Sequence, residues 1–180
     1  MAEYRILGIC GALRAASTNR LLLHEAVRIF APADFAEADL RVPLYDGDVE
    51  TTDGIPVGVS RLAALIGAAD AVIIATPEYN KAVPGVLKNA LDWVSRTKGN
   101  PWADMPVAIM SAAAGRAGGE RSQSALRLAM NPFRARLIAG PEVLVAGSSA
   151  AFDLEGKLID ARTVKGLTEL MAALRREIGR

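Results

Sequence analysis

Three short polar segments carry the residue types that could bind a small anionic ligand, and the first contains Arg14, Ser17 and Asn19. It runs into an expected helix, whose amino terminus offers free backbone N–H groups and the positive end of the helix dipole. Arg14 adds a positive charge, and this combination suits a phosphate monoester. The pattern is equally typical of a simple helix cap formed by Ser17 and Asn19, and the segment alone does not separate these interpretations.

The second segment is Pro77, Glu78, Tyr79 and Asn80, with Pro84 a few residues further on. The prolines stiffen the backbone, so its amide groups can be held ready for the edge of a flat heterocycle beside the aromatic ring of Tyr79. Glu78 resembles a catalytic acid, but an isolated loop glutamate is usually solvated and we expect no catalytic role. Asn80 either donates to the ligand or stabilises the turn.

The third segment begins at Ser111 and Ala112 and contains Gly115, Gly118 and Gly119. Its glycines permit either close approach of the backbone to a ligand or a tight turn between strand and helix. The first segment, for its part, has neither the G-x-G-x-x-G pattern of dinucleotide sites nor the lysine-containing pattern of a P-loop. Those two kinds of nucleotide site therefore lose their main support.

The elements that must position these segments alternate along the chain. Each segment follows an apolar run typical of a buried strand and precedes an amphipathic stretch typical of a helix. We expect strands at residues 4–10, 39–42, 70–76, 106–110 and 137–146, and helices at about residues 19–30, 56–68, 83–94, 119–130 and 163–178. Residues 43–54 are expected to form a long acidic loop.

Five alternating strands and helices predict an α/β fold, a three-layer sandwich around a five-stranded parallel sheet. Right-handed crossovers leave a flavodoxin-like order 2-1-3-4-5 or half of a dinucleotide-binding fold. The polar segments follow the first, third and fourth strands, so in the order 2-1-3-4-5 all three lie at one sheet edge. A mononucleotide binds at that edge in such sheets, which favours the flavodoxin-like order.

Composition limits the partners of this chain. With 180 residues and 51% hydrophobic content, we expect one domain over residues 1–180. The formal net charge of +1, with no basic tract, predicts no nucleic-acid partner. One cysteine and one histidine predict no intrachain disulfide and no metal site. No segment resembles a signal peptide or a membrane span, so we expect a cytoplasmic protein.

Four other residues invite a functional role but have simpler interpretations. Cys10 ends the first strand and is expected in the core, whereas His24 is expected on the surface. Trp93 and Trp102 either border a partner subunit or pack internally.

Five motifs together resemble the NADPH-dependent FMN reductase family, and in particular its bacterial quinone and chromate reductases. The resemblance extends from about residue 5 to about residue 145. The motifs are Gly11-Ala-Leu-Arg14-x-x-Ser17-x-Asn19, Pro43-Leu-Tyr-Asp-x-Asp48, Thr76-Pro-Glu-Tyr-Asn80, Val83-Pro-Gly-x-Leu-Lys-Asn-Ala-Leu-Asp-Trp93 and Gly115-x-x-Gly-Gly119.

This resemblance implies a flavodoxin-like fold, noncovalent FMN and a homodimer or homotetramer. The phosphate would be held by Arg14, Ser17 and Asn19, the isoalloxazine would be lined by the second segment, and the ribityl side would be closed near Ser111. The implied cofactor-binding residues are Ala12, Leu13, Arg14, Ser17, Thr18, Asn19, Pro77, Glu78, Tyr79, Asn80, Ser111, Ala112 and Gly115.

The implied activity is NAD(P)H-dependent reduction of quinones or other small acceptors, such as chromate, azo compounds or free flavin, by ping-pong hydride transfer. The flavin carries the chemistry, so no catalytic side chain is expected, and NADPH or NADH is the cosubstrate. Two alternatives are a flavodoxin-type electron carrier and a mononucleotide-binding regulatory module. The charge of +1 counts against the carrier, because carriers that dock on basic partners tend to be strongly acidic.

The chain also departs from the family pattern at several positions. Ala12 stands where the family usually has serine, and Lys81 and Ala82 replace the small or aromatic residue and the serine often found there. These two replacements leave the preference for an acceptor open.

Overall fold

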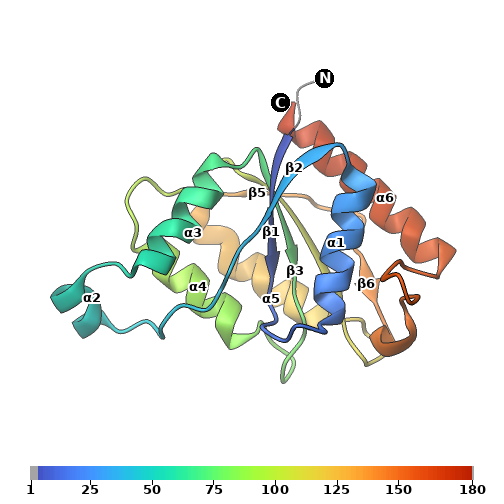
Figure 1. Cartoon of the computed structure of the whole chain (residues 1–180), viewed down its shortest axis with the longest axis horizontal. Coiled ribbons are helices and arrows are strands. Elements are labelled where there is room, and N and C mark those ends of the chain that lie inside the picture. The colour runs from blue at the N-terminus through green and yellow to red at the C-terminus, as the bar shows by residue number, and fades with distance from the viewer. Residues whose placement is uncertain (1–3, 180) are drawn as a thin grey trace.

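The computed structural model describes residues 4–179 and contains a parallel β-sheet between two layers of helices (Figure 1). The strand order is β2-β1-β3-β4-β5, which confirms the flavodoxin-like order, and β6 also pairs with β4. All of these pairings are parallel. The strands are β1 (Tyr4–Cys10), β2 (Ala33–Glu37), β3 (Ala71–Ala75), β4 (Pro106–Ala112), β5 (Arg136–Leu137) and β6 (Leu144–Val145).

The helices cover both faces of the sheet, as the alternating sequence pattern predicts. Helices α1 and α6 cover one face of the sheet, and α3, α4 and α5 cover the other (Figure 1). Their buried side chains belong to two separate core clusters. The α-helices are α1 (Thr18–Phe30), α2 (Gly47–Asp53), α3 (Val57–Ala68), α4 (Gly85–Ser95), α5 (Glu120–Met130) and α6 (Ala161–Ile178), with short 3-10 helices η1 (Asn131–Phe133) and η2 (Ser148–Ala150).

Strand β3 shows why the sequences of the central strands are continuous apolar runs. All five of its residues are fully buried, because helices lie on both sides of it. Ile73 belongs to the core beneath α1 and α6, whereas Val72 and Ile74 belong to the core beneath α3, α4 and α5. The central strand therefore joins two separate hydrophobic layers and fixes the sheet edge at which the polar segments emerge.

The prediction for the second strand was wrong: β2 occupies Ala33–Glu37, not residues 39–42. It is an edge strand in which half-buried and exposed residues alternate, and Phe35 is its one large apolar side chain. Phe35 packs where Gly8 of β1 leaves room, since a Cβ atom at Gly8 would lie 2.6 Å from the Phe35 ring. This partner is remote in sequence, so the pairing is not visible in the local pattern.

The predicted fifth strand over residues 137–146 is also corrected. The structure has two strands of two residues each, β5 and β6, and both pair with β4. Gly140 and Pro141 lie between them. Proline has no amide hydrogen for a ladder and glycine weakens a strand, so the pairing stops and resumes further along β4. Within residues 4–179, the sheet consequently has six strands rather than the expected five.

The segment expected to be an acidic loop contains α2 and is attached to α4. Asn89 of α4 accepts a hydrogen bond from Tyr45 N at 2.9 Å and donates to Pro43 O at 2.9 Å. The indole Nε1 of Trp93 donates to the same carbonyl at 2.8 Å, and its ring meets that of Tyr45 edge to face. Trp93 is fully buried, so it packs inside this chain.

Cys10 and Trp102 are buried in the core, and His24 is exposed, as predicted for the cysteine and the histidine.

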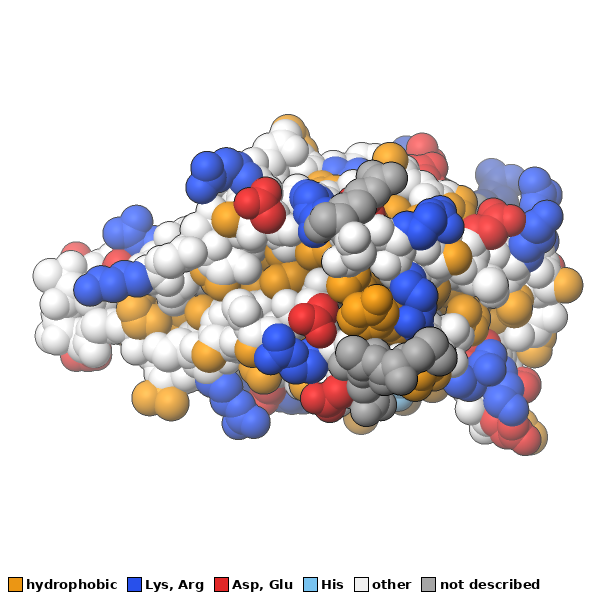
Figure 2. Space-filling view, turned by 90° about the horizontal axis from the view of Figure 1, so that it is seen from above, with side chains coloured by type: hydrophobic (Ala, Val, Ile, Leu, Met, Phe, Trp, Pro, Cys, Tyr) orange, Lys and Arg blue, Asp and Glu red, His pale blue; other side chains and the backbone are white. Residues whose placement is uncertain are grey.

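Figure 2 shows the face at the amino ends of the strands, where basic and acidic side chains are interspersed. Within residues 4–179, no helix combines the length and the apolar character needed to cross a membrane.

Candidate functional site

The three polar segments meet at the carboxyl edge of the sheet. Gly11 lies against the second segment, because a Cβ atom there would be 3.0 Å from Pro77 Cδ. The third segment is joined to the first by Asn19, whose side chain bonds the backbone of Ala112. The structure therefore brings together the residues that the sequence placed after three different strands.

The first segment presents a run of unsatisfied backbone donors. Among the residues that the structure describes, the amide groups of residues 13–18 have no hydrogen-bond acceptor. The guanidinium of Arg14 is exposed and likewise has no partner within residues 4–179. Free amides ahead of a helix and a cation beside them form an arrangement that binds an anion. The geometry thus fits the phosphate of a mononucleotide.

Ser17 and Asn19 are occupied within the protein. The hydroxyl of Ser17 accepts from Asn19 N at 3.2 Å and caps α1, as the simpler interpretation of the sequence expected. The side-chain amide of Asn19 donates to Ala112 O at 2.8 Å, and its oxygen accepts from Ala112 N at 2.9 Å. Both groups of this buried amide are used, so its structural role is to fix the start of α1 to the end of β4.

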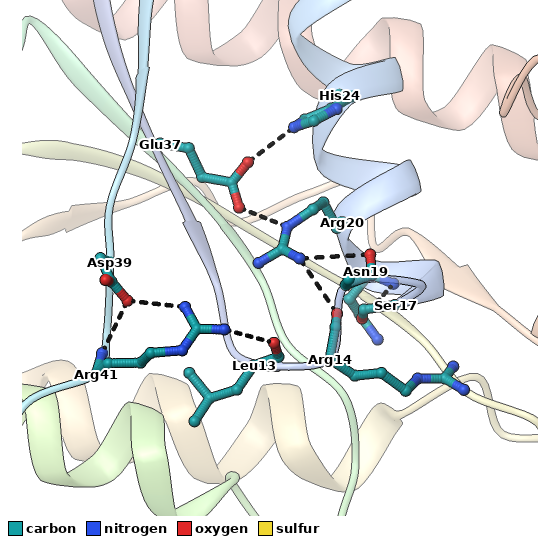
Figure 3. A network of polar contacts seen from close by, with 10 residues as sticks. Leu13, Arg14, Ser17, Asn19, Arg20, His24, Glu37, Asp39 and Arg41 are labelled. Carbon is teal, nitrogen blue, oxygen red and sulfur yellow. Dashed lines mark hydrogen bonds and ion pairs between the residues drawn. The ribbon is translucent and has the colours of Figure 1, made fainter.

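A network of charged side chains surrounds the outer side of the same loop (Figure 3). Arg20 contacts Glu37 at 2.7 Å, and His24 Nε2 lies 2.8 Å from the other Glu37 oxygen. Burial raises the pKa of the Glu37 carboxyl, but the hydrogen bonds from His24 and Arg20 outweigh it and hold the pKa below its ordinary value. Glu37 is therefore ionised at neutral pH and able to orient Arg20.

The carboxylate of Glu78 has a defined partner, contrary to the expectation that it is simply solvated. Its Oε2 accepts from Arg121 N at 3.1 Å and from Ser122 N at 3.3 Å, so it caps the first turn of α5. The hydroxyl of Ser122 also donates to Pro77 O at 2.9 Å. These bonds fix the second segment to α5 and occupy the carboxylate in a structural contact.

A tight turn follows Glu78 and presents the tyrosine ring. Tyr79 and Ala82 exchange backbone hydrogen bonds of 3.3 and 3.1 Å around Asn80 and Lys81. Both central residues have positive φ, 51° for Asn80 and 64° for Lys81. Asparagine tolerates this conformation well, so Asn80 is suited to form the turn. Tyr79 is 52% exposed and leaves an aromatic face open to the solvent.

The third segment uses its glycines for packing. Gly118 has a φ of +60°, and a Cβ atom there would lie 2.7 Å from the carbonyl carbon of Leu144. At Gly119, with a φ of +96°, a Cβ atom would lie 2.8 Å from Ser111 Oγ. Gly115 is exposed with open space around it. The first two glycines are therefore required by the turn, while Gly115 leaves the backbone accessible.

Ser111 is enclosed by this turn. Its hydroxyl donates to Gly118 O at 2.6 Å and accepts from Gln123 Nε2 at 2.9 Å, and the side chain is fully buried. It thus supports the third segment from beneath.

The sequence did not single out Arg20, Glu37, Arg41 or Ser122. Arg20 and Arg41 donate to backbone carbonyls of the first loop, Glu37 pairs with Arg20, and Ser122 bonds the second segment. Arg20 carried one available signal, since it directly follows the capping residues of α1. Glu37 carried none, because the strand on which it lies was misplaced. Ser122 was hidden on a helix whose polar positions read as ordinary surface.

Two hollows in the surface border residues of these segments or residues that pack against them. One of about 260 Å³ borders Ala12 and Leu13 on the side of β2 and includes Arg20, Glu37 and Arg41. A larger one of about 440 Å³ lies between the β6 segment and α6 and is lined in part by Leu144, which packs against Gly118 of the third segment. No cluster of potential metal ligands occurs among the described residues 4–179. The candidate site is therefore identified by the free amides of residues 13–18 and not by the volume of a hollow.

Comparisons with a family model and with known proteins agree on one family for this chain. A model of the NADPH-dependent FMN reductase family matches residues 4–150. An NAD(P)H-dependent FMN reductase of Pseudomonas aeruginosa is 40% identical over 174 residues, covering 96% of this chain and 94% of that protein. A quinone reductase of Escherichia coli is 37% identical over 176 residues, covering 95% and 93%.

A solved structure agrees with these sequence matches. The flavoenzyme NAD(P)H:(acceptor) oxidoreductase FerB of Paracoccus denitrificans superposes with a TM-score of 0.88 at 28% identity, covering 98% of this chain and 97% of its own. The match extends over both helical layers and the whole sheet. This chain belongs to the NADPH-dependent FMN reductase family.

Proposed function

We propose that this protein is an FMN-dependent NAD(P)H oxidoreductase that reduces quinones by ping-pong hydride transfer. The observation that carries the proposal is the run of unpartnered amides at residues 13–18 with the free guanidinium of Arg14, at the edge where this fold binds a mononucleotide. Quinones are the first choice of acceptor because several relatives are named as quinone reductases. Chromate, azo compounds and free flavin are further candidate acceptors.

The residues of the chain would bind and orient the cofactor. The amides of residues 13–18 and Arg14 would hold its phosphate, with Ser17, Thr18 and Asn19 shaping the helix start. The second segment would line the ring through its backbone, since the Glu78 carboxylate is already bonded to α5. Ala112 and Gly115 would lie on the ribityl side, with Ser111 supporting them.

When bound, FMN would accept a hydride from NAD(P)H and pass the electrons to the acceptor. The contribution of the protein is then positioning and an open flavin face, beside which the exposed ring of Tyr79 would lie. We also propose a homodimer or homotetramer in the cytoplasm.

Purified apoprotein reconstituted with FMN tests this function. NADPH and NADH oxidation should be stimulated by a benzoquinone, with initial rates that give parallel double-reciprocal lines as expected for a ping-pong reaction. Riboflavin, which lacks the phosphate, should reconstitute much less activity at the same concentration. An FMN-loaded protein that oxidises neither NADPH nor NADH with any acceptor would contradict the proposal.

A further inference from the structure

Two arginines hold three consecutive carbonyl groups of the loop between β1 and α1 (Figure 3). Arg41 Nη2 donates to Leu13 O at 3.0 Å. Arg20 Nη1 donates to Arg14 O at 3.2 Å and to Ala15 O at 3.4 Å. The side chain of Arg14 extends away from both of these guanidinium groups (Figure 3). One side of the loop therefore faces the guanidinium groups of Arg20 and Arg41. The unpaired guanidinium of Arg14 extends from the other side.

The orientation of these carbonyls determines the orientation of the amides. In a planar trans peptide, the C=O of one residue and the N–H of the next point to opposite sides. Carbonyls of residues 13–15 that face Arg20 and Arg41 thus direct the N–H groups of residues 14–16 to the opposite side. Those N–H groups have no acceptor among the described residues. The arginines hold the donors in the orientation that an anion on that side requires.

The two arginines differ in how firmly they are held. Arg20 pairs with Glu37 at 2.7 Å, and the two side chains are only 26% and 24% exposed. Arg41 pairs with Asp39 at 3.2 Å, and these side chains are 59% and 67% exposed. Exposed ion pairs contribute little because water screens them, whereas a partly shielded pair with good geometry holds its partners better. The side chain of Arg20 is therefore held in place more firmly than that of Arg41.

We propose that Arg20, oriented by Glu37, is a positioning residue that keeps the amides of residues 14–16 directed at the FMN phosphate. The proposal rests on the proposed function, since it requires FMN at this loop. The loop has no glycine or proline between Ala12 and Ser17. Without Arg20, FMN itself would have to order this loop on binding, and that ordering would lower the affinity for FMN. The binding affinity of a flavin that has no phosphate would not be lowered in this way.

Titration of the apoprotein with FMN and with riboflavin, followed by quenching of flavin fluorescence, tests this role. Arg20→Met should weaken FMN binding on the order of tenfold, while riboflavin binding should change by less than about twofold. Arg20→Lys keeps the charge but not the fork of donors, so it should fall between Arg20→Met and the wild type.

Arg136→Met is the matched control. Arg136 also holds two carbonyls, Asp104 O at 2.8 Å and Glu177 O at 3.0 Å, and pairs with the Glu177 carboxylate at 3.2 Å. It lies at the start of β5, the outer strand of the sheet opposite to β2, on which the Arg20 partner Glu37 lies. This variant should leave the dissociation constants of both flavins unchanged.

A second variant tests whether Glu37 acts through Arg20. Glu37→Gln should weaken FMN binding severalfold, and Arg20→Met combined with Glu37→Gln should bind FMN no more weakly than Arg20→Met alone. If circular dichroism shows that Arg20→Met is unfolded, the FMN-to-riboflavin ratio of Glu37→Gln decides the question. Unchanged FMN binding, or an equal loss for both flavins, would overturn the proposal. A wild-type protein that binds riboflavin as well as FMN would overturn the phosphate assignment within the proposed function itself.

Discussion

Asn19 and Ala112, 93 residues apart in the sequence, exchange two hydrogen bonds through the side-chain amide of Asn19, at 2.8 and 2.9 Å. The pair connects the first turn of α1 to the last residue of β4. Two of the three site loops are thus fixed to each other by one buried side chain. Its removal should loosen the cofactor site as well as the fold.

Asn19→Ala should lower the free energy of unfolding by about 2–4 kcal/mol, because two buried hydrogen bonds are lost and backbone groups are left unpaired. Urea denaturation followed by circular dichroism measures the change. Asn131→Ala provides the control, since Asn131 is exposed and, among the described residues, only its backbone carbonyl accepts a hydrogen bond outside the helices. It should change the free energy by less than about 0.5 kcal/mol. Equal effects of the two substitutions would refute the structural role of Asn19.

Arg14→Ala should weaken FMN binding by about 10- to 100-fold, because charge-assisted hydrogen bonds to the phosphate are lost. Fluorescence titration or flavin retention on dialysis gives the result. Arg61→Ala removes another exposed arginine, on α3, and should retain FMN like the wild type. Undiminished flavin retention in Arg14→Ala would show that the phosphate lies elsewhere.

Glu78→Gln should leave the rate of NADPH oxidation within about twofold of the wild type when FMN is saturating, because the carboxylate caps α5 and moves no proton. The loss of charge at the helix start should lower the free energy of unfolding by about 1 kcal/mol. Steady-state kinetics and urea denaturation measure the two effects separately. A large fall in turnover with FMN still bound would show that the carboxylate takes part in the reaction.

Burial raises the pKa of the Cys10 thiol above its ordinary value, although contacts with the Ala12 backbone and with Ser17 oppose the shift. A raised folded-state pKa stabilises the fold below the unfolded pKa of about 9, and this contribution is lost as the pH rises through the folded value. The difference in unfolding free energy between the wild type and Cys10→Ala should therefore shrink above about pH 9. A difference that stays constant from pH 7 to pH 10.5 would contradict this account.

How much the sequence could predict depended on where each interaction partner lies. Strand β3 was predictable because each of its residues is apolar, which burial on both faces requires. Strand β2 was not, since the packing of Phe35 depends on the space above Gly8 in another strand. Pro141 interrupts a run that otherwise reads as one strand.

In the candidate site, too, a role could be predicted only where the interaction partner lies nearby in the sequence. The capping role of Ser17 was visible because its partner is two residues away. The partner of Asn19 lies on β4 and that of Arg20 on β2, so neither contact could be inferred from local spacing. Local patterns thus located the loops, and contacts between distant segments determined what each side chain does there.

Anaerobic reduction of the FMN-loaded protein by NADPH in a stopped-flow spectrophotometer tests the proposed hydride transfer most directly. The yellow flavin absorbance should be lost rapidly in a single turnover and should return when a benzoquinone is added. A bound flavin that NADPH and NADH leave oxidised, and that only dithionite can reduce, would contradict the account and indicate an electron carrier or a binding module.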